Sequence, residues 1–345
     1  MANDIFDTLA NGKKNWLEGA YTHTQIQQAN LPDPAWFVPT LIPNPGLVAI
    51  TGRPGSFKTF FTQWLALRLS AHLPLFDTWD TEPPFNKSQV PTEPINVCFI
   101  EEEMNARQVK QRANDMRTFG DHTNFHWLIS SGFSLKEKTK LAELKHFVES
   151  KNIKLLIFDP FTSVAGMKDE NSNAEAREVM DMIRHEFVDS AHGATVIFIH
   201  HPSKSIGGED NIRGAGDILG KCDMHFVLEK RGEEPTTTID VKCKKSRYLW
   251  PQDFSCEMVS NMHDLGRLEW QYRGSLRDRF VGETEDAKEN ILTALRGNVD
   301  GIKKADVFFA VNASANDMTY KRAWDSLLAN KKITKVGAYH FRSIP

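Results

Sequence analysis

Five mostly apolar runs alternate with helix-forming segments over the first two thirds of the chain. The runs are LVAITG, INVCFIEEE, FHWLI, IKLLIFD and ATVIFIHH, and the first begins at Leu47. Strands that are apolar on both faces and separated by helices are typical of a parallel sheet covered by helices on both sides. The sequence therefore predicts an α/β fold with a mostly parallel sheet.

The 345 residues exceed the usual size of one domain, so we expect a large core with a small appendage. Three further strand-like runs, MHFVLEK, TTTIDVKCKKS and RLEWQYRG, predict an antiparallel extension of the sheet. The predicted organisation is a lead-in over 1–35, a core over 36–274, a polar linker over 275–284 and a separate small domain over 285–345.

Composition narrows the class of protein. The hydrophobic share of 40% and the charged share of 25% are ordinary for a globular protein. No stretch approaches the roughly 18 apolar residues of a membrane span, and the N-terminus has no secretion-signal pattern, so a cytoplasmic protein is expected. The four cysteines form no CxxC pair and predict neither zinc nor disulfides. A net charge of -3 gives no overall attraction for nucleic acid, so any such binding would depend on local patches or a channel.

A strand, a glycine-bearing loop, a lysine, a threonine and a helix follow one another in LVAITGRPGSFKTFFTQWLALRL. In such a loop the backbone N–H groups face phosphates, Lys58 reaches the β and γ oxygens, and the Thr59 hydroxyl ligates magnesium. ATP with Mg²⁺ is therefore the predicted ligand. The predicted nucleotide-binding residues are Gly52, Arg53, Pro54, Gly55, Ser56, Phe57, Lys58, Thr59 and Phe60.

Phe57 stands where this pattern usually has the glycine before the lysine. A bulky residue restricts φ, so a slightly reshaped loop is expected. The alternative interpretation is an ordinary strand-to-helix turn.

In GRPGSFKTF the chain resembles the RecA-like ATPases of the plasmid RepA helicase type and their phage and plasmid relatives, which tolerate a phenylalanine before the lysine. The resemblance extends from about Trp36 to Tyr248. It implies a RecA-like P-loop core that hydrolyses ATP.

The resembling ATPases keep their water-activating glutamate after the second strand, and in INVCFIEEEMNARQV the matching residue is Glu103. Glu101 and Glu102 remain open as alternatives, as does a simple acidic turn. The strand KLLIFDP ends in Asp159, which fits a carboxylate that holds magnesium, so Thr59 and Asp159 are the predicted metal residues. An Asp-Pro pair also commonly begins a turn.

The strand ATVIFIHH ends in His200 and His201, where the resembling family carries a polar residue that senses the γ-phosphate. Adjacent strand residues point to opposite faces, so the pair is a poor metal chelate. His200 is the preferred sensor, against an ordinary surface or core histidine. The glycine-rich segment that follows carries Lys204 and Arg213, which the resemblance assigns to single-stranded DNA; a solvated loop is the alternative.

Lys245 and Arg247 lie two residues apart on a predicted strand, so both side chains project from one face. DnaB-like rings carry a similar pair that reaches the neighbouring subunit's nucleotide, which implies catalytic roles in trans and a homo-oligomer. The alternative is a basic edge strand that discourages aggregation.

Residues 285–345 predict three helices, over 285–296, 303–312 and 318–330, and then a short hairpin. This order is similar to a winged-helix domain. Its third helix opens with Lys321 and Arg322 among its first residues, which predicts contact with duplex DNA, although such domains also dock proteins.

Together these features favour an ATP-driven motor, a ring with a hexamer as its expected size, that translocates on single-stranded DNA as a replicative helicase of a phage, plasmid or mobile element. One rival is a RecA-like recombination or annealing ATPase. The other is a DNA-binding regulator in which ATP only sets the oligomeric state.

Overall fold

The structure is a computed structural model. It describes residues 20–29, 33–76, 93–117, 122–169, 172–200, 215–232, 236–248, 251, 253–263, 265–296, 300–314, 316–336 and 339–344.

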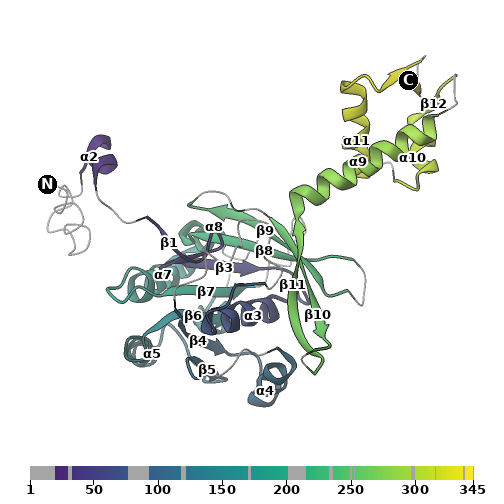
Figure 1. Cartoon of the computed structure of the whole chain (residues 1–345). Helices are drawn as coiled ribbons and strands as arrows, with labels where there is room; N and C mark the ends of the chain where they lie inside the picture. Colours follow the sequence, from purple (N-terminus) through teal and green to yellow (C-terminus); the bar gives the residue numbers. More distant parts are fainter. Residues whose placement is uncertain are drawn as a thin grey trace.

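A nine-stranded sheet in the order β11-β10-β9-β8-β3-β7-β6-β4-β5 forms the centre of the core (Figure 1). From β5 to β8 neighbouring strands are parallel, and from β8 to β11 they are antiparallel. The predicted α/β fold with a mostly parallel sheet is therefore confirmed. The strands are β3 (Leu47–Thr51), β4 (Asn96–Glu101), β5 (Phe125–Ile129), β6 (Ile153–Asp159), β7 (Thr195–His200), β8 (Met224–Lys230), β9 (Thr238–Ser246), β10 (Phe254–Asn261) and β11 (Arg267–Ser275).

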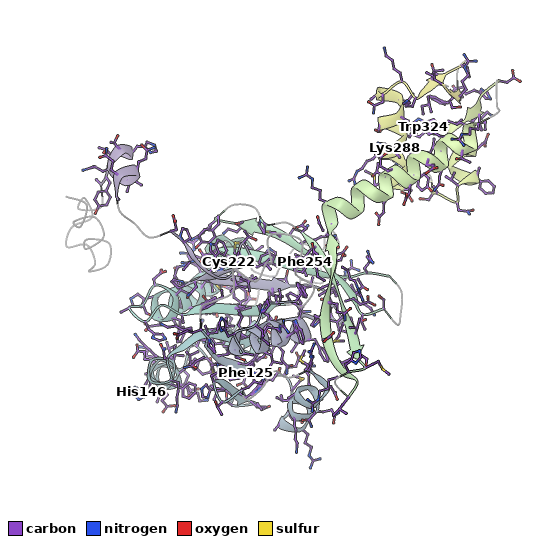
Figure 2. The ribbon with its side chains drawn as sticks, in the orientation of Figure 1. Phe125, His146, Cys222, Phe254, Lys288 and Trp324 are labelled. Carbon is purple, nitrogen blue, oxygen red and sulfur yellow. The ribbon has the colours of Figure 1, made fainter. Side chains whose placement is uncertain are left out.

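Two hydrophobic clusters lie on the two faces of this sheet, because its central strands are apolar on both sides. Trp64 belongs to the cluster with α3, and Val179 belongs to the cluster with α7. Side chains fill the space between sheet and helices (Figure 2). The helices are α3 (Lys58–Ser70), α4 (Ala106–Asp115), α5 (Lys138–Ser150), α6 (Phe161–Ala165), α7 (Asn173–Ile183), the π-helix η3 (Arg184–Val188) and α8 (Ala215–Lys221).

Helix α3 is buried all round, because β11 packs on the side that faces away from the parallel strands. Every residue from Phe61 to Ser70 is buried. The Phe61 ring meets the Trp270 ring of β11 edge to face, with centroids 5.8 Å apart. Since α3 follows the phosphate-binding loop directly, β11 also lies close to that loop.

The N-terminal segment has a short helix α2 (His23–Gln28) and a two-stranded hairpin of β1 (Ala35–Val38) and β2 (Ile42–Asn44). Phe37 and Leu41 of the hairpin region are buried in the α3 cluster. The lead-in is therefore packed on the core from the hairpin onwards.

The C-terminal part has the elements α9 (Leu276–Leu295), β12 (Ile302–Lys303), α10 (Lys304–Ala310), α11 (Met318–Ala329), β13 (Ile333–Lys335) and β14 (His340–Ser343). The predicted linker over 275–284 is wrong, since α9 begins directly after β11. Arg, Glu and Leu favour helix, and the single Gly282 does not interrupt it. Trp324 lies in a separate small hydrophobic cluster here (Figure 2).

None of the described helices combines the length and the hydrophobicity needed to cross a lipid bilayer. The four cysteines are buried and free of disulfides, as predicted: Cys98, Cys222, Cys243 and Cys256.

Candidate ATP site

The predicted phosphate-binding loop runs from the end of β3 to the start of α3. Gly52 has φ 153°, and a Cβ there would lie 2.3 Å from the carbonyl oxygen of Leu228, so only glycine fits. The Lys58 Nζ donates hydrogen bonds to the carbonyl oxygens of Gly52 (2.8 Å) and Arg53 (3.0 Å). The loop thus closes around the lysine ammonium, which is where the motif places a phosphate.

Phe57 takes up the backbone conformation that glycine usually supplies at its position, with φ 59° and ψ 22°. The expected reshaping of the loop is therefore wrong: the loop keeps a left-handed residue before Lys58, although this costs about 1 kcal/mol for a residue with a Cβ. The Phe57 ring lies against Trp270 (centroids 6.1 Å apart) and Phe60 (6.3 Å), and this packing offsets the cost.

Lys58 is 5% exposed, so its ammonium group is largely shielded from water. Burial lowers the pKa of Lys58 to about 8, while attraction by Asp159 and Glu103 acts in the opposite direction. Lys58 is also the first residue of α3, and an ammonium at a helix N-terminus is suited to an anionic ligand.

Asp159 and Thr59 are brought together, as the metal prediction requires. The two side chains share a hydrogen bond, and burial together with Glu101 and Glu103 raises the pKa of Asp159 to about 7. Asp159 Oδ2 is buried without a partner among the described residues. Oxygen donors of this kind fit Mg²⁺, which usually binds one or two carboxylates plus phosphate oxygens. Among the described residues, no group of three or more His, Cys, Asp or Glu is arranged to hold a metal ion.

The three consecutive glutamates have different surroundings. Glu101 is buried beside Asp159 in the strand register; its Oε1 accepts from the N–H groups of Glu103 and Met104, and its Oε2 has no described partner. Burial raises the pKa of Glu101. Glu102 accepts backbone hydrogen bonds from residues 131–133, so it is committed to holding that loop. Glu103 is exposed and acts electrostatically on Lys58 and Asp159.

Arg112 of α4 faces the same carboxylates and was missed from sequence. Its guanidinium carbon lies 4.2 Å from the centre of the Phe60 ring, and Nη1 is buried without a described partner. Burial lowers the pKa of Arg112, whereas Glu101, Asp159 and Glu103 raise it. The available signal was helical spacing, because Arg112 follows the buried Val109 of α4 by three residues and shares its face.

A cavity of about 260 Å³ adjoins the loop on the side of β8. Its lining residues are Gly52, Arg53, Pro54, Ser56, Val227, Leu228, Glu229 and Lys230. A concave space next to a phosphate-binding loop provides room for a nucleotide outside its phosphates.

A family model described as an AAA domain matches residues 20–206, more than half of the chain and all of the loop, Glu103 and Asp159. The chain belongs to this AAA domain family, AAA_25. The KaiC-like protein PH0186 from the archaeon Pyrococcus horikoshii OT3 is a similar solved structure, with 14% identity, 71% of this chain and 98% of that chain covered, and a TM-score of 0.47. No curated protein matches the chain. The family and the strand order show a RecA-like P-loop ATPase.

Within the AAA domain, His200 ends β7 beside Thr51 of β3. It is 2% exposed, and its ring meets Phe161 edge to face at 5.7 Å. His200 thus lies at the loop end of the sheet, where a sensor is needed, and the sensor role stays a prediction. His201, Lys204 and Arg213 lie outside the described residues.

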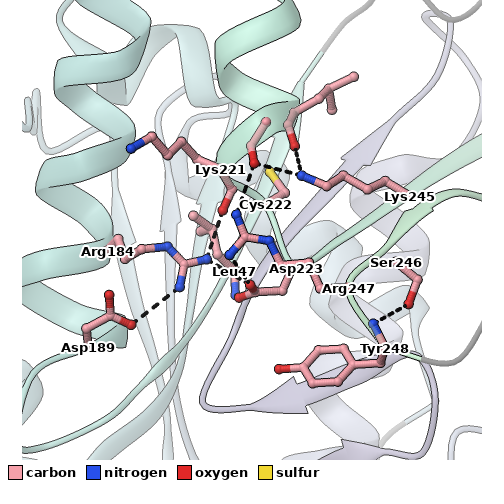
Figure 3. A network of polar contacts seen from close by, with 12 residues as sticks. Leu47, Arg184, Asp189, Lys221, Cys222, Asp223, Lys245, Ser246, Arg247 and Tyr248 are labelled. Carbon is pink, nitrogen blue, oxygen red and sulfur yellow. Dashed lines mark hydrogen bonds and ion pairs between the residues drawn. The ribbon is translucent and has the colours of Figure 1, made fainter. Parts of the chain in front are cut away.

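Lys245 and Arg247 lie beyond the matched AAA domain, on β9 and just after it. Both donate to the carbonyl oxygen of Gly220 at the end of α8, in agreement with their predicted common face. Arg247 also pairs with Asp223 at 3.2 Å (Figure 3). Strand β9 lies between β8 and β10, but the described pairing with β10 covers only residues 238–241 of β9, so the alternative of a basic edge at Lys245 and Arg247 stays open.

On the C-terminal part, Asp317 caps α11 by accepting from the N–H groups of Thr319 and Tyr320. Lys321 donates to Asn316 at 3.2 Å, and Arg322 is exposed. Their predicted role in binding DNA is untested.

Proposed function

We propose that this AAA domain protein is an ATP-driven motor that works as a ring on single-stranded DNA, as a replicative helicase of a phage, plasmid or mobile element does. It would act in the cytoplasm with ATP and Mg²⁺. Lys58 and Thr59 bind phosphate and metal, Asp159 holds the metal, and Glu103 orients the attacking water. His200 senses the γ-phosphate.

The position of Arg247 is the observation that carries the proposal. Arg247 bonds to Asp223, whose backbone N–H bonds to Leu47 at the start of β3. The phosphate-binding loop begins after Thr51 at the other end of β3. Four to five strand residues separate the two ends, about 16 Å. Arg247 therefore lies far from the nucleotide of its own subunit, as an arginine that serves a neighbouring subunit must.

The side chain of Arg247 is also accessible to a neighbour. It is 45% exposed, whereas its partner Asp223 is 8% exposed. A half-exposed guanidinium anchored on one side by a carboxylate keeps N–H donors available for a phosphate on the other. Lys245 beside it is held by the carbonyl oxygens of Leu219 and Gly220. We assign Lys245 to the support of this surface.

The C-terminal part supports a second contact. Its order of helix, strand, helix, helix and two strands, with a three-stranded sheet β12-β14-β13, supports the proposal of a winged helix, in which α11 would be the recognition helix. We propose that Lys321 and Arg322 contact duplex DNA ahead of the motor.

The test is steady-state ATP hydrolysis with and without single-stranded DNA. Wild type is expected to be stimulated strongly, and Lys58→Ala and Arg247→Ala are each expected to lose the stimulated activity. Arg273→Ala serves as the control, since this exposed arginine forms an ion pair with Glu257 in β10.

Mixing the two inactive variants tests the trans assignment. Lys58→Ala keeps an intact Arg247, and Arg247→Ala keeps an intact loop, so mixed rings contain some complete sites. Partial recovery of hydrolysis supports the ring. Hydrolysis that depends on Lys58 but ignores DNA would overturn the motor and leave a nucleotide-switched regulator; filaments instead of rings in electron micrographs would favour a recombination ATPase.

A further inference from the structure

Trp270 brings strand β11 into contact with the phosphate-binding loop. This residue is 1% exposed, and its ring meets the Phe57 ring edge to face. The indole Nε1 donates no hydrogen bond to a described residue, so Trp270 acts through the shape of its ring. It lies in the strand that leads directly into α9.

Phe57 needs such support because of its backbone. Its φ of 59° is the conformation that glycine adopts without strain and that a residue with a Cβ resists. Left alone, Phe57 would relax to negative φ and move the N–H groups on either side of it. A residue stays in this backbone conformation only when several contacts around it prevent any other.

The surroundings of Phe57 are arranged to do so. Trp270 lies 6.1 Å away on one side, and the Lys230 ammonium lies 5.8 Å from the ring centre. We propose that Trp270 is a positioning residue of the ATP site, which clamps Phe57 and thereby keeps the phosphate-binding loop in its ligand-ready shape.

The clamp itself is anchored. Next to Trp270, Glu269 forms an ion pair with Arg117 at 2.6 Å, and the carbonyl oxygen of Leu268 accepts from the Arg117 N–H at 2.8 Å. Met116, at the end of α4, forms a strand bridge with Leu268. Since α4 also carries Arg112, β11 is fixed to the helix that borders the catalytic carboxylates.

The inference rests on the ATP site of the proposed function but not on DNA or on ring formation. Its test is the dissociation constant of the nonhydrolysable analogue AMPPNP with Mg²⁺, measured without DNA. A protein that binds AMPPNP normally but shows no DNA stimulation would overturn the motor and leave the clamp intact.

Substitutions at residue 57 separate the effect of backbone strain on AMPPNP binding from the effect of the contact with Trp270. Phe57→Ala keeps the Cβ but loses the contact with Trp270, and it is expected to weaken AMPPNP binding about tenfold. Phe57→Gly loses the same contact but removes the strain, so it is expected to bind AMPPNP about fivefold more tightly than Phe57→Ala. Equal losses in the two variants would overturn the proposal.

A double-mutant cycle then tests Trp270 directly. Trp270→Leu is expected to weaken AMPPNP binding about tenfold in the natural chain and less than about twofold in the Phe57→Gly chain, where no clamp is needed. Trp270→Phe, which keeps an aromatic ring, is expected to restore much of the affinity. The same loss in both backgrounds would overturn the proposal.

A core substitution separates positioning from stability. Phe61 also contacts Trp270, at 5.8 Å, but lies within α3 beyond the loop. Phe61→Leu is expected to lower the melting temperature as Trp270→Leu does, with AMPPNP binding of the folded protein unchanged. If Phe61→Leu weakens binding as much as Trp270→Leu, general loosening of the core explains both, and the clamp is overturned.

Discussion

Both ends of the central strands carry charged side chains, but their polar atoms are satisfied to different degrees. At the carboxyl ends, Glu101 Oε2, Asp159 Oδ2 and Arg112 Nη1 are buried without a described partner. At the amino ends, the Asp223 carboxylate accepts from the Leu47 N–H and from two arginines. Buried polar atoms without partners lower the stability of the fold unless a ligand supplies the missing partner. Within one subunit, the carboxyl end is thus built to bind the nucleotide, whereas Asp223 at the amino end holds the fold and anchors Arg247.

The largest expected effect separates adjacent carboxylates at the binding end. Glu103→Gln is expected to lower kcat about a hundredfold, because it would remove the base that we propose to orient the water. Glu102→Gln is the matched control, since Glu102 is committed to the backbone of residues 131–133. Its kcat is expected to stay within about threefold. Single-turnover hydrolysis measures both, and a greater loss in Glu102→Gln would reverse the assignment.

At the opposite end the expected effect is on folding. Asp223→Asn removes the charge shared by Arg184 and Arg247 and is expected to cost about 2 kcal/mol, a change of about thirtyfold in the folding equilibrium. Asp189→Asn, which touches Arg184 from a position 58% exposed, is expected to cost almost nothing. Urea unfolding of both variants measures these changes in the free energy of unfolding. Equal costs would remove the contrast between the two ends.

Arg112 offers a smaller effect at the binding end. Arg112→Ala removes the guanidinium that faces Glu101 and Asp159, and it is expected to lower kcat about tenfold with little change in stability. Arg107→Ala, an exposed arginine on the same helix, is the control and is expected to match wild type. Unchanged hydrolysis in Arg112→Ala would make this residue part of the core packing around Phe60.

The smallest effect is on pH dependence. Asp159 must be ionised, and its pKa is raised to about 7, so kcat/KM is expected to rise with pH up to that value. Lys58 must be protonated, and its pKa is lowered to about 8, so kcat/KM is expected to fall above it. The expected loss at pH 6 relative to the maximum is about fivefold. A flat profile across this range would contradict the assignment of these two groups.

The sequence predicted the binding end better than the rest. Apolar runs that end in carboxylates indicate parallel strands whose carboxyl ends lie at one edge of the sheet. Lys58, Thr59 and Asp159 therefore lie close together, as expected. It did not predict the left-handed Phe57, because that conformation depends on Trp270, more than two hundred residues away in the chain. It also missed the helix over 276–284, whose polar composition is equally typical of linkers.

The absence of a connecting loop between β11 and α9 has a mechanical consequence. A strand that passes straight into a helix transmits rotation, and the 20 residues of α9 make an arm about 30 Å long. A tilt of about 10° at the strand would then carry the far end of the arm through about 5 Å. The C-terminal part is therefore placed to move when β11, the strand that contacts the ATP site, tilts.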